Sequence, residues 1–194
     1  MPITVDLLKP DAAALSVLAL ALGLLELACA LPCLLFPGAA ARALRGFPRA
    51  AWPGWILTSI ALVWSALWIW AMPFQFLAPV KSNLWILTPV AIVAVAIFVD
   101  ELLSCRALGG VLVLLPAPLL SAAQWHPSPW RYLVLILAYL CAISGMYIIA
   151  APFRLRDALH WLADSPRALR WVAALDLALG LLLGILALTA YRLT

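Results

Sequence analysis

Long apolar runs recur along this chain, and they constrain its fold more than any other feature. The first run covers residues 12–36 and contains one charged residue, Glu26. A helix of about 20 apolar residues crosses the hydrocarbon core of a bilayer, so each such run predicts a transmembrane helix. Six spans are predicted, near residues 12–36, 53–72, 83–103, 107–124, 130–151 and 169–190.

The composition leaves almost no room for a soluble domain. Hydrophobic residues make up 68% of the 194 residues and charged residues 10%, whereas a soluble domain is about half apolar and about a quarter charged. The first apolar run is also too long for the core of a cleavable signal peptide, so we expect it to remain as a span. The sequence therefore predicts an all-α, polytopic transmembrane bundle that forms one domain over residues 1–194.

The connections after the first and the fifth span share a pattern at an offset of 115 residues. In both, a proline is followed by apolar residues at positions i, i+3, i+4 and i+7, which is the stripe of an amphipathic helix. The two stripes are Ala40, Ala43, Leu44 and Phe47, and Leu155, Ala158, Leu159 and Leu162. We therefore predict three helical hairpins, about 12–72, 83–124 and 130–190, with a short interfacial helix in the 1–2 and 5–6 connections.

Basic residues are distributed unequally between the two sides of the predicted bundle. Eight lie in the connections between spans 1 and 2, 3 and 4, and 5 and 6, and four lie on the other side. Those assigned to the two interfacial helices and their ends are Arg42, Arg45, Arg49, Arg154 and Arg156. Because cytoplasmic connections carry an excess of Lys and Arg, both termini are predicted outside the cytoplasm. The preference for arginine, alanine and leucine hints at a GC-rich bacterial genome, so a bacterial inner membrane is the expected location.

Two acidic residues lie inside predicted spans. Glu26 is ten residues before Phe36, at the cytoplasmic end of the first span, and Asp176 is ten residues after Pro166, at the cytoplasmic start of the sixth. At ~1.5 Å per residue, both lie roughly 15 Å deep from the same side, where they could face each other. Either the pair forms a proton or cation site, or each carboxyl bonds a neighbouring polar group and holds two helices together.

Each acid lies on a line of small residues along its helix. The lines are Ser16, Ala19, Gly23, Glu26, Ala30 and Cys33 in the first span, and Ala173, Asp176, Gly180, Gly184 and Ala187 in the sixth. Small residues let helix backbones approach closely in lipid. Gly23, Gly180 and Gly184 are therefore predicted to form a helix-packing seam.

No motif points to catalysis, a metal or a cofactor. No histidine lies inside a predicted span, which argues against a transmembrane haem, and the sequence has no nucleophile elbow, HExxH, phosphate loop or CxxC. Asp157, His160 and Asp164 share one side of the predicted helix in the 5–6 connection. With Arg154 and Arg156 beside them, these residues describe a solvated surface facing lipid headgroups. We expect no metal there, no enzymatic activity and no nucleic-acid partner.

Three hypotheses about function remain. The preferred one is a non-catalytic accessory or structural subunit that packs against other membrane subunits within the lipid bilayer. The second is a small proton- or cation-linked transporter or channel that works through Glu26 and Asp176. The third is a membrane protein that binds a lipid- or porphyrin-type ligand in a tryptophan-lined groove, although most of the ten tryptophans lie near span ends, where an aromatic belt is expected.

Overall fold

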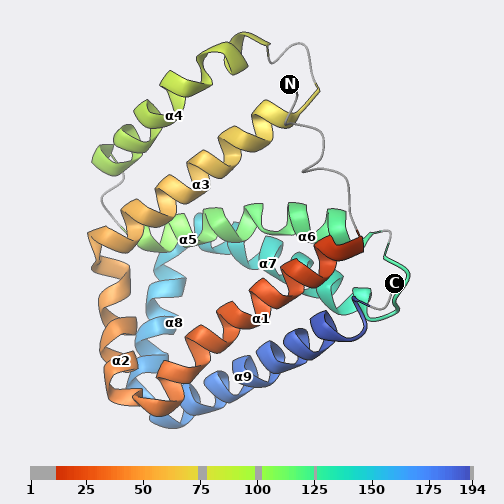
Figure 1. The fold of residues 1–194 in the computed structure, drawn as a ribbon. Coiled ribbons are helices and arrows are strands. Elements are labelled where there is room, and N and C mark those ends of the chain that lie inside the picture. The colour runs from red at the N-terminus through yellow and green to blue at the C-terminus, as the bar shows by residue number, and fades with distance from the viewer. Residues whose placement is uncertain (1–11, 74–77, 99–101, 125, 193–194) are drawn as a thin grey trace.

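The computed structural model describes residues 12–73, 78–98, 102–124 and 126–192, and the regular structure within these ranges is entirely helical (Figure 1). The elements are α1 (Ala12–Leu35), α2 (Pro37–Gly46), the 3-10 helix η2 (Phe47–Arg49), α3 (Ala51–Ala71), α4 (Ala78–Phe98), α5 (Leu103–Leu114), α6 (Pro116–Ala123), α7 (Arg131–Ala150), α8 (Pro152–Asp164) and α9 (Pro166–Leu188).

Six helical stretches are long and apolar enough to cross a membrane. They are Ala14–Leu35, Ala51–Ala71, Ala78–Phe98, Leu103–Ala123, Arg131–Ala150 and Pro166–Leu188. The fourth span consists of α5 and α6, which meet at Pro116 because proline lacks the amide that would continue the helical hydrogen bonds. These stretches confirm the predicted all-helical, polytopic membrane protein.

The third span begins five residues earlier than predicted. The polar segment at residues 81–83 belongs to the first turns of α4. There the side chains of Ser82 and Asn83 each donate a hydrogen bond of 3.0 Å to the carbonyl of Pro79, and Lys81 donates to the carbonyl of Met72. These local bonds let polar residues continue the helix. The acidic residues Asp100 and Glu101, which the sequence places at the end of this span, lie outside the described residues.

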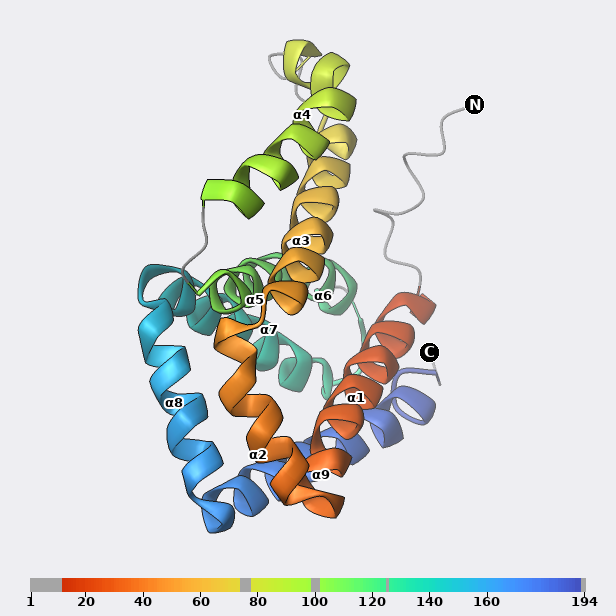
Figure 2. The ribbon, with the colours of Figure 1, turned by 90° about the vertical axis from the view of Figure 1, so that its left-hand side faces the viewer.

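The helices that pack most extensively are not neighbours in the sequence. α1 runs antiparallel to α9, while α5 packs between α3 and α7, and α2 lies beside α8 (Figures 1 and 2). The predicted hairpins are therefore not confirmed. α2 has ten residues and is about 15 Å long at 1.5 Å per residue. That length separates α1 from α3 by more than the ~8–10 Å at which helices pack.

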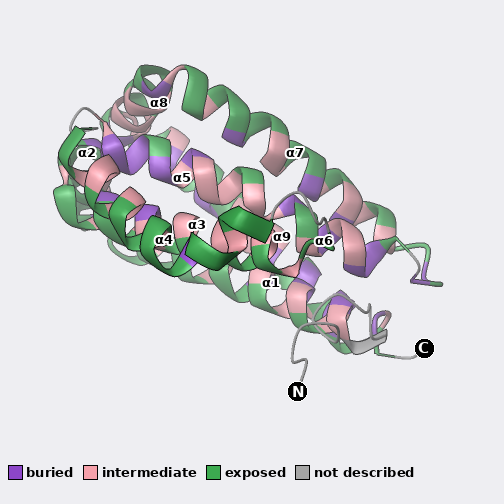
Figure 3. Ribbon diagram, turned by 90° about the horizontal axis from the view of Figure 1, so that it is seen from above, coloured by how far each residue is buried: buried purple, intermediate pink, exposed green. Residues whose placement is uncertain are grey.

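The core lies at one end of the molecule, where the beginning of α1, the end of α9, α6 and the beginning of α7 converge. The most deeply buried large side chains there are Leu15, Leu119, Val134, Leu183 and Tyr191. Figure 3 shows that buried residues are frequent along α5 and α6 and recur along α7, whereas α4 is largely exposed. α4 contacts only α3 extensively among the described residues.

Candidate functional site: two carboxyl groups at the contact of α1 and α9

Gly23 on α1 and Gly180 on α9 bring the two backbones into contact. A Cβ atom on Gly23 would lie 2.8 Å from the carbonyl oxygen of Gly180, and a Cβ atom on Gly180 would lie 2.9 Å from that of Gly23. Side-chain carbons do not approach backbone oxygen so closely, so neither position accepts a larger residue without movement of a helix. The small residues on the same lines, Ala19, Ala30, Ala173 and Ala187, are buried.

Gly184 lies at the same contact through its backbone. Its backbone nitrogen lies 3.1 Å from the position of a Cβ on Gly23, but a Cβ on Gly184 itself would meet nothing within 4 Å. The close approach therefore requires Gly23 and Gly180, whereas the packing tolerates a side chain at Gly184.

Glu26 and Asp176 lie at this contact, as their depth in the two spans predicts. The Cβ of Glu26 is 3.1 Å from the position of a Cβ on Gly180, and Asp176 is one turn earlier on α9. Both acids are half-buried, and their carboxyl groups interact electrostatically. Neither side chain has a hydrogen bond or ion pair within the described part of the chain. The structure thus brings the two predicted acids together at one level of the span.

Three cysteines, two on α1 and one on α7, lie near enough to the two acids to interact with them electrostatically. Cys29 interacts electrostatically with Glu26 and Asp176, Cys33 with Asp176, and Cys141 on α7 with Glu26. Cys141 is also the position that matches Glu26 at the 115-residue offset of the repeat. All of these cysteines are free, and no group of three His, Cys, Asp or Glu side chains in the described ranges is arranged to hold a metal ion. The site therefore contains two carboxyl groups among apolar side chains, with thiol groups nearby.

The basic residues predicted at the interfacial helices lie on or next to α2 and α8. Arg45 of α2 pairs with Asp164 of α8 at 2.5 Å and donates a second hydrogen bond of 3.4 Å to the carbonyl of Ala163. Arg156 pairs with its neighbour Asp157 at 2.8 Å. The remaining three, Arg42, Arg49 and Arg154, are exposed. The two helices of the repeat are thus joined by one ion pair at the surface.

His160 does not lie on a solvated face, and that prediction was wrong. The residue is half-buried, and its Nε2 atom is enclosed without a hydrogen-bond partner among the described residues. The reason is the side on which α8 packs: Pro152 and Ala163 are buried, while Ala158, from the predicted apolar stripe, is exposed. The helix is turned relative to its hydrophobic pattern because it rests against α2, α5 and α7 as well as α9.

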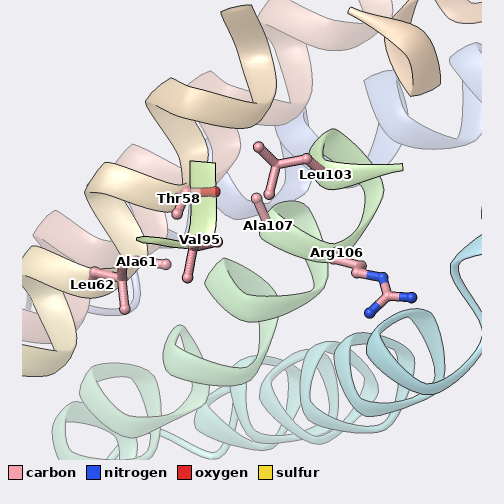
Figure 4. Close-up of a pocket in the computed structure, with 7 residues that line it drawn as sticks. All are labelled: Thr58, Ala61, Leu62, Val95, Leu103, Arg106 and Ala107. Atoms are coloured by element: carbon pink, nitrogen blue, oxygen red, sulfur yellow. The ribbon is translucent and has the colours of Figure 1, made fainter. Parts of the chain in front are cut away.

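Two cavities along α3 were not predicted from the sequence. One, of about 260 Å³, lies where α3, α4 and α5 meet and is lined by Thr58, Val95 and Leu103 among others (Figure 4). The other, of about 430 Å³, lies between α3 and α4 beside Trp70 and Trp85. Only the number of tryptophans in this part of the chain hinted at such a space, and an aromatic belt accounts for them equally well.

The chain matches no protein-family model, no curated protein and no solved structure. Its chemistry must therefore be inferred from its own residues.

Proposed function

We propose that this protein is a non-catalytic integral membrane protein that serves as an accessory or structural subunit of a larger membrane complex. The observation that carries the proposal is the position of α4. Among the described residues this helix contacts α3 extensively, and most of its surface has no neighbour from the rest of that part of the chain. Its exposed face includes Trp85, Ile86, Val90, Ile97 and Phe98, which are between 58% and 85% exposed. A span held by one neighbour is suited to packing against a second polypeptide.

The parts of the chain outside the spans support the same proposal. In the described ranges they amount to α2, η2, α8 and short links, which is too little for a catalytic or recognition domain. We place α2 and α8 at the cytoplasmic surface of a bacterial inner membrane, with both termini outside the cytoplasm. Exposed Arg42 and Arg154 suit lipid phosphates there, and exposed Phe153 and Trp161 suit the headgroup boundary.

The native mass in a mild detergent tests this function. We expect the 21.0 kDa chain to be extracted together with different, larger polypeptides. A photo-crosslinking residue at Ile86 of α4 should join it to one of them. The matched control is Leu25 of α1, which is similarly exposed at 58% but belongs to a helix already paired with α9. A native mass of one chain, or of a multiple of it, without an α4-specific crosslink would overturn the proposal.

A second candidate function has one observation in its favour, the meeting of Glu26 and Asp176. Two carboxylates side by side in a low dielectric repel each other strongly, so such a pair is suited to share a proton or hold a cation. Proton- or cation-linked transport through the pair predicts uptake into vesicles that Glu26→Gln and Asp176→Asn each abolish, while Cys29→Ser does not. Equal flux in all of these variants would exclude it.

A further inference from the structure

The seam between α3 and α4 forms an apolar groove that is open on one side. Its volume of about 430 Å³ falls in the range of sites for small molecules, which is roughly 300–1,000 Å³. The lining is almost wholly apolar and includes Ala66, Leu84 and Pro89. The rings of Trp70 and Trp85 meet edge to face beside it, with centroids 6.5 Å apart.

One charged side chain lies at the outer end of this seam. α3 and α4 together contain a single ionisable residue that is charged at neutral pH, Lys81. It precedes Leu84 by three residues and Trp85 by four, so it shares their face of α4. Its ammonium donates one hydrogen bond, to the carbonyl of Met72. Because an ammonium has three donors, others remain for an anion. The cavity is thus an apolar space with a cation at one end.

The α3–α4 seam continues toward α5, where the smaller cavity of about 260 Å³ lies. The two cavities follow one another along α3, at residues 58–62 and 63–70. A chain-shaped occupant fits this succession better than a planar ring. At the inner end the guanidinium of Arg106 points away from Thr58 and Val95 (Figure 4). Positive charge therefore faces the seam at the Lys81 end, and an amphiphile would enter with its anionic group there.

We propose that the α3–α4 seam binds one molecule of an anionic glycerophospholipid, with an acyl chain in the groove against Trp70 and Trp85 and its phosphate at Lys81. The lipid fills a space that this chain leaves open and adds contacts to α4, the least supported helix. The site does not depend on the proposed subunit function, because the residues that line the larger groove belong to α3 and α4.

Native mass spectrometry of the delipidated, full-length protein tests the site with two added probes, phosphatidylglycerol and phosphatidylcholine of the same chain length. We expect one phosphatidylglycerol to be retained in preference to phosphatidylcholine. Lys81→Gln should lower that preference about fivefold, since a lysine at a membrane surface contributes roughly that factor toward an anionic lipid. Arg42→Gln, which removes an exposed cation elsewhere, should leave it unchanged.

A second pair of variants tests the cavity rather than the charge. Ala66→Phe fills the space and should abolish retention of either lipid, whereas Val90→Phe, at an α4 position that does not line the cavity, should not. If Ala66→Phe fails to fold, Lys81→Gln still tests the proposal, because this variant should lose the preference for phosphatidylglycerol over phosphatidylcholine. Equal retention of the two lipids, no retention at all, or unchanged retention in both Ala66→Phe and Lys81→Gln would overturn the proposal.

Discussion

The α1–α9 pair and the α3–α4 pair both consist of two antiparallel apolar helices, yet they pack in opposite ways. In the most apolar stretches of α1 and α9, 28% of the residues are buried, compared with 11% in α3 and 6% in α4. Gly23 and Gly180 bring the first pair into backbone contact. No glycine contact joins α3 and α4 in the described part of the chain, and Trp70 and Trp85 line the groove at their seam.

The difference shows that small and large residues have different effects on how closely helices pack in a membrane bundle. Lipid is as apolar as the helix surface, so helices associate through close packing rather than through exclusion of water. Small residues give α1 and α9 that packing, and the two acids lie within it. Bulky side chains keep α3 and α4 apart. We therefore expect the contact between α1 and α9 to contribute most to the free energy of unfolding. We expect the packing of α4 to depend on the molecule that binds to it.

The largest contrast is expected when one leucine in each helix pair is shortened to alanine. Leu183→Ala removes a side chain that is 1% exposed in the core around α9, and it should cost about 2–5 kcal/mol of unfolding free energy because it leaves an enclosed void. Leu84→Ala, at the buried position of α4, enlarges a cavity that is already open and should cost about 1–2 kcal/mol. Equilibrium unfolding in detergent measures both, and equal losses would contradict the comparison.

The glycine contact gives the next largest effect. Gly23→Ala and Gly180→Ala each place a carbon within 3 Å of a backbone oxygen, so each should destabilise the protein by about 1–3 kcal/mol. Gly184→Ala is the matched control on the same helix, and it should change stability by less than about 0.5 kcal/mol. Thermal unfolding of the three variants provides the measurement. A loss at Gly184 equal to that at Gly180 would show that α9 presents a different face to α1.

Tyr191 ties the end of α9 to α7, and its removal should have a smaller effect. Its hydroxyl donates a 2.8 Å hydrogen bond to the carbonyl of Trp130, and its ring packs edge-on against His126. Tyr191→Phe leaves that carbonyl without its partner and should cost about 1 kcal/mol. The same denaturation experiment in detergent detects this loss, and unchanged stability would mean that the bond is dispensable.

Tyr191 also predicts a dependence on alkaline pH. Burial raises the pKa of Tyr191 from 10.0 to about 12, so folding favours the neutral phenol. Its contribution is complete below pH 10 and is lost as the pH rises through 12. Melting temperatures between pH 9 and pH 12 should therefore fall less steeply in Tyr191→Phe than in the wild type. Parallel curves would contradict the shift.

The ion pair between α2 and α8 should matter least. Arg45 and Asp164 are joined at 2.5 Å, but their side chains are 52% and 67% exposed, and such surface pairs contribute about 0–1 kcal/mol. Asp164→Asn should lower the melting temperature slightly at low salt and not at high salt. Asp157→Asn is the control, since its partner Arg156 is on the same helix. A loss above about 2 kcal/mol would mean that α2 and α8 set the stability.

The sequence by itself determined the elements. Length and hydropathy are local properties, so they located the six spans, and the two amphipathic connections appeared from their 3.6-residue pattern. The spacing of Glu26 and Asp176 from the ends of their spans also placed them at one depth, where the structure brings them together. Gly23 and Gly180, which belong to the predicted lines of small residues, lie at the contact of α1 and α9.

Only the tertiary structure decided which spans pair, that α4 contacts little besides α3, that the Nε2 of His160 is enclosed and that the α3–α4 seam is hollow. The reason is physical. An apolar helix face is compatible with contact to acyl chains as well as with contact to protein. Hydropathy therefore does not distinguish a face that packs on protein from one that faces the bilayer. That choice depends on the shapes of residues far apart in the chain, such as Gly23 against Gly180 and Trp70 against Trp85.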